Sequence, residues 1–129
     1  MGRSWITANA ALAVACALCA GPAAAQSGAD ATARANRMAY DAAMKCFVAN
    51  GHAIGLRERA GDTVKAAYYE TRARLSFDTA MKLGAVLRLS GSRIDQDFRL
   101  AQTRELPPMV TDETYFLDAV ATCKALGLM

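Results

Sequence analysis

Two cysteines, one in the middle of the chain and one near its end, carry the clearest chemistry in the sequence. Cys46 and Cys123 each lie on the apolar line of a segment with helical periodicity. Paired cysteines in an exported protein typically form a disulfide. We therefore expect a Cys46–Cys123 disulfide, which would stabilise the fold by at most ~4.5 kcal/mol in the chain-entropy model. The alternative is two inert buried thiols.

His52 is the only histidine, and in a haem site its candidate partners would be Met38, Met44, Met81 and Met109. It lies six residues after Cys46, about 240° round a helix, and so off the apolar line. A haem held by His52 and a methionine is disfavoured because the sequence lacks a Cys-x-x-Cys-His attachment motif. We predict a partly exposed histidine, with no cofactor and no metal site.

No group of residues predicts catalysis. Asp95 and Asp97 are two apart, so on a helix they point about 200° away from each other and cannot share a substrate. A disulfide would consume the thiols, and no Ser/His/Asp spacing is recognisable. Arginines at 57, 59, 72 and 74 lie on two neighbouring segments, where they form either a patch or, more commonly, a solvated face. We predict no catalytic residues.

The beginning of the chain predicts export. A basic start at Arg3 is followed by an apolar run from Ala8 to Ala20 and by Ala23-Ala24-Ala25, the pattern of a cleavable secretory signal peptide. The run is shorter than the ~20 residues that a membrane-spanning helix needs. Residues 1–25 are expected to be removed after Ala25, which places the mature protein in the periplasm or outside the cell. Lipidation at Cys16 is the alternative.

The mature chain, residues 26–129, is expected to form one domain. Its charge is mild: the formal net charge of the whole sequence is +3, and removal of Arg3 lowers it by one. Such a balance does not indicate nucleic acid as a partner. We also expect no transmembrane segment in the mature chain.

The segment 62–89 is the helix around which the rest is expected to be organised. Two stripes at helical spacing predict a wide buried face with neighbours on two sides. The first comprises Ala66, Tyr69, Ala73, Phe77, Ala80, Gly84 and Leu87, and the second Val64, Tyr68, Leu75, Leu83 and Val86.

A longer helix is expected to precede it. This helix begins near Asp30 or Thr32, after a frayed leader at 26–29, and ends at Gly61-Asp62. Gly61 suits a left-handed helix end and Asp62 an N-cap, so the two helices form an antiparallel hairpin. Asn50-Gly51 is a turn signal, but the apolar phase continues through it. We expect one helix, with a break at Asn50-Gly51 as the alternative.

Two shorter helices complete the prediction. Ser90-Gly91-Ser92 ends the helix of segment 62–89, and Ser92 with Asp95 starts the next. That third helix stops at Pro107-Pro108, and Thr111 caps the last one. The inward residues of the third are Ile94, Phe98, Ala101 and Glu105/Leu106, with Asp97 outside; those of the fourth are Phe116, Val120, Cys123 and Leu126.

These patterns predict an all-α, four-helix, up-down-up-down bundle built on the long hairpin. The function ranked first is a non-enzymatic interaction module with an unknown protein partner in the periplasm, of the adaptor, inhibitor, immunity or chaperone type. The acid-led last helix and the arginine-rich hairpin are its candidate surfaces. The alternative is a small-ligand or cofactor-binding bundle. Its site would lie between the first two helices, where Gly51, Gly55, Ala73 and Gly84 leave space.

Overall fold

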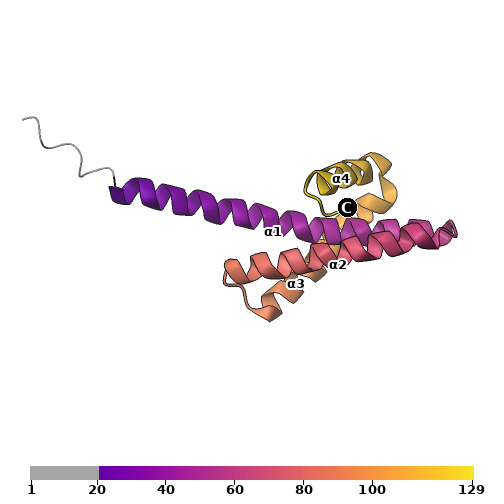
Figure 1. The fold of residues 1–129 in the computed structure, drawn as a ribbon, viewed down its shortest axis with the longest axis horizontal. Helices are drawn as coiled ribbons and strands as arrows, with labels where there is room; N and C mark the ends of the chain where they lie inside the picture. Colours follow the sequence, from indigo (N-terminus) through magenta and orange to yellow (C-terminus); the bar gives the residue numbers. More distant parts are fainter. Residues whose placement is uncertain (1–20) are drawn as a thin grey trace, which may run out of the picture.

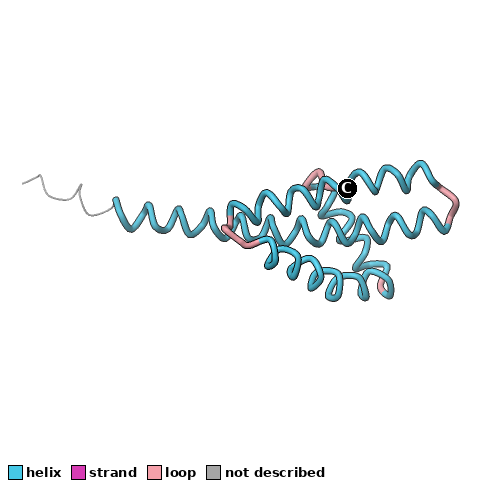
Figure 2. Tube along the Cα trace, turned by 90° about the horizontal axis from the view of Figure 1, so that it is seen from below, coloured by secondary structure: helices cyan, strands magenta, loops and turns pink. Residues whose placement is uncertain are grey.

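The computed structural model describes residues 21–129, which form four helices joined by short turns (Figure 1, Figure 2). The helices are α1 (Gly21–Arg59), α2 (Thr63–Val86), α3 (Gly91–Thr111) and α4 (Glu113–Ala125). The expected all-α fold is confirmed for this part of the chain. The predicted signal peptide lies mostly outside the described residues; cleavage after Ala25 would remove the first five residues of α1.

α1 is the central helix of the molecule. It packs against each of the other three helices, and α3 also packs against α4. Its N-terminal part extends beyond the hairpin and is exposed to solvent (Figure 1). The predicted start near Asp30 or Thr32, after a frayed leader, is wrong. Alanine, the best helix former, dominates residues 21–35, and Thr32 donates its hydroxyl hydrogen bond to the Gly28 carbonyl inside the helix at 3.0 Å.

The turn between α1 and α2 has the predicted chemistry. Gly61 adopts a φ of 71°, and its N–H donates to the Glu58 carbonyl at 3.0 Å. The Asp62 N–H donates to the Arg57 carbonyl at 2.9 Å, and the Asp62 carboxylate caps α2 by accepting from the Lys65 N–H at 3.0 Å. Both glycine and aspartate act as expected. α1 also runs through position 50–51 without a break.

α2 buries a narrow line of small residues rather than a wide face. The residues of α2 buried against the rest of the molecule are Ala66, Ala73, Ser76, Ala80 and Gly84. Most of the second predicted stripe is exposed, with Val64 at 81% and Val86 at 62% of their possible area, but Leu83 is partly buried and packs against the core. Phe77, predicted for the first stripe, is 39% exposed. The prediction fails because α1 is the only helix with which α2 packs extensively.

α2 ends earlier than the sequence predicts. Its last helical residue is Val86, and the turn is made by Arg88 at a φ of 57°, with the Leu89 N–H donating to the Gly84 carbonyl at 2.9 Å. A non-glycine residue at positive φ is uncommon, so this end carries no glycine signal. Ser90 then caps α3 by accepting from the Arg93 N–H at 3.2 Å, which corrects the predicted cap at Ser92.

α3 does not stop at Pro107-Pro108 as predicted. It continues to Thr111 with both prolines inside it. Proline removes a donor at each position, but the last turn is held by burial of Met109 and by the Asp112 N–H, which donates to the Pro108 carbonyl at 2.9 Å. Asp112 rather than Thr111 caps α4, because its carboxylate accepts from the Tyr115 N–H at 3.2 Å.

The core follows the middle of α1. Three rings join α1, α2 and α3: Phe47 lies 5.2 Å from Phe98 and 6.1 Å from Phe77, and Phe77 stacks on Phe98 at 4.9 Å between centroids. Buried residues of α3 include Ile94, Phe98, Ala101 and Glu105, as predicted. In α4 the buried residues are Ala119 and Cys123, whereas the predicted Leu126 is half exposed.

Candidate functional site

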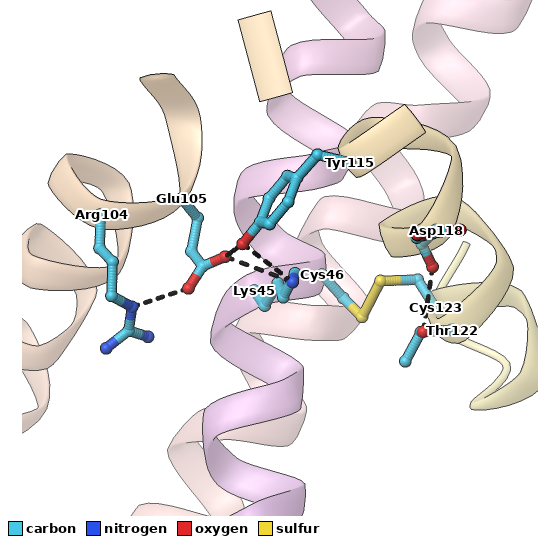
Figure 3. A network of polar contacts seen from close by, with 8 residues as sticks. All are labelled: Lys45, Cys46, Arg104, Glu105, Tyr115, Asp118, Thr122 and Cys123. Atoms are coloured by element: carbon cyan, nitrogen blue, oxygen red, sulfur yellow. Dashed lines mark hydrogen bonds and ion pairs between the residues drawn. A yellow bond between two sulfur atoms is a disulfide. The ribbon is translucent and has the colours of Figure 1, made fainter. Parts of the chain in front are cut away.

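The two cysteines lie at disulfide distance. Their sulfur atoms are 2.11 Å apart and their Cα atoms 5.6 Å apart, across a sequence separation of 77 residues. Both side chains are almost completely buried between α1 and α4 (Figure 3). The pair therefore has the position of a staple that holds α4 against the middle of α1, and it is sealed from any substrate.

Beside the cysteine pair lies a polar cluster of Lys45, Arg104, Glu105 and Tyr115 (Figure 3). The buried Glu105 accepts hydrogen bonds from the Tyr115 hydroxyl and from Arg104 Nε, the latter at 2.7 Å. Lys45 Nζ lies 3.4 Å from Glu105 Oε2 and 3.1 Å from the Tyr115 hydroxyl. Burial alone would raise the pKa of Glu105, but these hydrogen bonds and the charge of Lys45 outweigh it and lower the pKa. The Glu105 carboxylate is therefore already paired with side chains of the protein itself.

A second buried carboxylate is engaged in the same way. Asp97 accepts from the Tyr40 hydroxyl at 3.0 Å and from Arg93 Nε at 2.9 Å. Its predicted outward position is wrong, because Tyr40 is fully buried and its hydroxyl needs a partner. Burial, followed by the hydrogen bond to Asp97, raises the pKa of Tyr40. Asp95, by contrast, is exposed, so the two carboxylates point apart as expected.

The feature left open is a groove between α1 and α3, which we call the His52 groove. Its volume is ≈ 770 Å³, within the range of small-molecule sites. One wall is a single face of α1, and the other is a line on α3 with a spacing of four. The lining residues are Phe47, Val48, Gly51, His52, Gly55 and Arg59 from α1, and Gln102, Leu106 and Val110 from α3.

Glycine makes room for this groove. A Cβ atom at Gly51 would meet nothing within 4 Å, and one at Gly55 would meet only Arg59 Nη1 at 3.3 Å. The guanidinium of Arg59 therefore lies along the floor beside Gly55. Without the two side chains, the backbone of α1 forms a shallow floor between the larger residues on either side.

His52 stands at the border between the groove and α4. Its ring meets the Phe116 ring edge to face, with 4.8 Å between centroids. Burial, followed by the nearby charge of Arg59, lowers the pKa of His52, so the imidazole is neutral near pH 7. Among the described residues, neither His52 nor Arg59 takes part in an ion pair. Of the described residues that line the groove, Arg59 is the one with a cationic side chain.

Two smaller cavities continue the apolar surface around α4. One of ≈ 370 Å³ shares His52 and Val110 with the groove and adds Leu56, Phe116 and Leu117. The next, of ≈ 210 Å³, shares Leu56, Phe116 and Leu117 and reaches α2 at Tyr69. Several large apolar side chains on this belt are strongly exposed, namely Leu56, Leu106, Val110 and Leu117.

Comparison with protein-family models, curated proteins and solved structures finds no match. In the described range, no group of three or more His, Cys, Asp or Glu residues could hold a metal ion. None of the described helices has both the length and the apolar character required to cross a membrane.

The structure corrects where the sequence places a ligand site. Gly51 and Gly55 do leave space, but on the α3 side of α1 rather than between α1 and α2. Gly84 leaves none, since a Cβ there would lie 2.6 Å from Ile94 Cδ1, and Ala73 is buried against the hairpin partner. The spacing of Gln102, Leu106 and Val110, together with the glycine pair, was the available signal. A helix that ends at Pro107-Pro108 includes Gln102 and Leu106 but not Val110, so the sequence predicts only part of this line.

Proposed function

We propose that this protein is a small exported, non-enzymatic binding protein, and that the His52 groove receives a small, largely apolar ligand. The observation that carries the proposal is the groove itself. It combines a volume of ≈ 770 Å³ with a mostly apolar lining and three polar side chains, His52, Arg59 and Gln102. Few polar groups in an apolar cleft are typical of sites that bind small molecules.

The buried ionisable groups support a binding role rather than catalysis. Asp97 and Glu105 are both held by hydrogen bonds from neighbouring side chains. The cysteine sulfurs lie against each other, and within residues 21–129 His52 forms no ion pair with a carboxylate that would orient it as a base. Export rests on the signal-peptide pattern at residues 1–25, which assigns the protein to the periplasm or the extracellular space.

The test is extraction of the ligand from protein purified gently from its own source. Organic extracts of the wild type and of Gly51→Leu are compared by mass spectrometry. Leucine at position 51 projects into open space, so it fills the groove while the helix keeps its register. We expect a small molecule in the wild-type extract that is strongly depleted in the variant. Equal extracts, or none from either protein, would count against the proposal.

The second candidate is the protein-interaction module that the sequence favours. The observation in its favour is the exposure of Leu56, Leu106, Val110 and Leu117 around the groove, an apolar belt suited to the helix of an adaptor, inhibitor, immunity or chaperone partner. A pull-down from periplasmic extract with wild type and Val110→Glu tests it. A partner retained by the wild type and lost in the variant would favour this role.

For the arrangement of the helices we retain the up-down-up-down order. Side-chain contacts support it. Tyr40 contacts Asp97 and Lys45 contacts Glu105, so α1 and α3 run in the same direction. Cys46 meets Cys123 and His52 meets Phe116, so α1 and α4 run in opposite directions.

A further inference from the structure

We infer that the ligand of the His52 groove is an amphipathic anion, an apolar chain ending in a carboxylate that Arg59 binds. This inference rests on the proposed binding function and adds the chemical class of the ligand. The apolar part would lie against Phe47, Val48, Leu106 and Val110, and the head group would lie at the Arg59 end of α1.

Arg59 supplies the charge at that end of the groove. Among the described residues, Arg59 makes neither a side-chain hydrogen bond nor an ion pair, in contrast to Arg74, Arg93 and Arg104. The acidic residue on the neighbouring surface, Glu113, lines the adjoining cavity and not the groove. Arg59 is exposed to solvent, so its guanidinium can reach a ligand in the groove and can bind a carboxylate through two parallel hydrogen bonds.

The other polar side chains that line the groove, His52 and Gln102, add no negative charge that would oppose an anion. His52 lies seven residues before Arg59 and therefore on the same face of α1, about 10 Å away along the axis. Neutral imidazole and the Gln102 amide can each donate a hydrogen bond without adding charge. Gly55, beside which the guanidinium lies, comes three residues after His52, so one ligand can contact both groups.

The experiment is a calorimetric titration with two probes of the same chain length, dodecanoate and dodecanol. The proteins are the wild type, Arg59→Gln, Arg57→Gln and Gly51→Leu. Arg57 is the matched control, because it lies on the same helix but lines the cavity beside α2 rather than the groove. Circular dichroism confirms that each variant is folded before titration.

We expect Arg59→Gln to weaken dodecanoate binding about tenfold or more, the usual effect of losing a charge-assisted hydrogen bond, and to leave dodecanol unchanged. Arg57→Gln should bind both probes like the wild type, and Gly51→Leu should lose both. Decanoate should bind about tenfold more weakly than dodecanoate, because two methylenes are no longer buried.

Two results would overturn the inference. The first leaves the proposed binding function intact, and the second overturns that function as well. If dodecanol binds as tightly as dodecanoate and Arg59→Gln changes neither, the groove binds apolar chains without recognising an anion, and the proposed function stands. If neither probe binds the wild type, or Gly51→Leu binds both as well as the wild type does, the groove is not the site and both proposals fail.

Discussion

The side-chain amide of Asn50 donates a 2.8 Å hydrogen bond to the carbonyl oxygen of Leu128, 78 residues further along the chain. The same nitrogen donates to the Cys46 carbonyl at 2.8 Å and lies 3.4 Å from Ser76 Oγ. Asn50 and Ser76 are both completely buried. A dipeptide with the composition of a turn, Asn50-Gly51, thus serves two other purposes inside one straight helix. Its asparagine holds the segment after α4, and its glycine opens the His52 groove.

Replacing Asn50 with alanine should destabilise the protein by about 2 kcal/mol, because the Leu128 carbonyl loses its shortest hydrogen bond in a buried position. Chemical denaturation measures the change. Asn36→Ala is the control, since Asn36 is on the same helix but only half buried. Equal effects from the two substitutions would show that the Asn50 contacts contribute nothing specific.

The cysteine pair predicts a covalent staple. We expect no free thiol in the mature protein when it is alkylated without reductant, and two labels after reduction, by mass spectrometry. Reduction should lower the melting temperature while α1 and α2 stay helical, because the reduced unfolded chain regains the freedom of a 77-residue loop. Cys46→Ser should leave Cys123 open to dimer formation on non-reducing gels. Two labelled cysteines in the unreduced native protein would refute the disulfide.

Gly84 of α2 and Gly51 of α1 predict opposite outcomes when each is replaced by alanine. Gly84→Ala places a Cβ 2.6 Å from Ile94 Cδ1 and 3.3 Å from Tyr40 Cε2, in the packed interface of α2. We expect a loss of about 1 kcal/mol or more, as is usual for overpacking. Gly51→Ala meets no atom within 4 Å and should stabilise α1 by up to about 1 kcal/mol. Thermal unfolding compares the two, and a stabilising Gly84→Ala would mean that the interface around Gly84 is loose.

Glu105 predicts the acid limit of stability. The pKa of Glu105 is lower in the folded protein than its ordinary value of about 4.5 in the unfolded chain. The ionised carboxylate therefore stabilises the fold fully above about pH 4.5, and this contribution is lost as the pH falls through the pKa of the folded protein. Glu105→Gln should cost about 2 kcal/mol at pH 7, because Lys45 and Arg104 lose a buried anion. It should also flatten the decline below pH 4.5. Glu70→Gln, which removes an exposed ion pair with Arg74, is the control and should change the stability at pH 7 by less than about 1 kcal/mol.

Periodicity and end signals predicted the hairpin well. Gly61 and Asp62 act through local backbone chemistry, which a few neighbouring residues determine completely. The phase of the apolar line across Asn50-Gly51 correctly predicted a continuous α1. The positions of Cys46 and Cys123 on their apolar lines also placed them close enough to meet.

The failures arise where tertiary contacts override local signals. Arg88 takes a left-handed conformation without being glycine, so α2 ends before the expected glycine. Pro107 and Pro108 remain helical because Met109 is anchored in the core. Asp97 turns inward because Tyr40 lies there, 57 residues away. The same holds for the groove, because a helix that ends at Pro107-Pro108 includes Gln102 and Leu106 but not Val110, the last residue of the α3 wall.

The most direct test of the central claim, that the His52 groove is the binding site, is to map binding by amide NMR during a titration with dodecanoate. We predict chemical-shift changes concentrated at Val48–Arg59 of α1 and Gln102–Val110 of α3. Smaller changes should follow near Phe116, where His52 contacts α4. Changes concentrated instead on the exposed stripe of α2 that contains Val64 and Val86 would contradict the account.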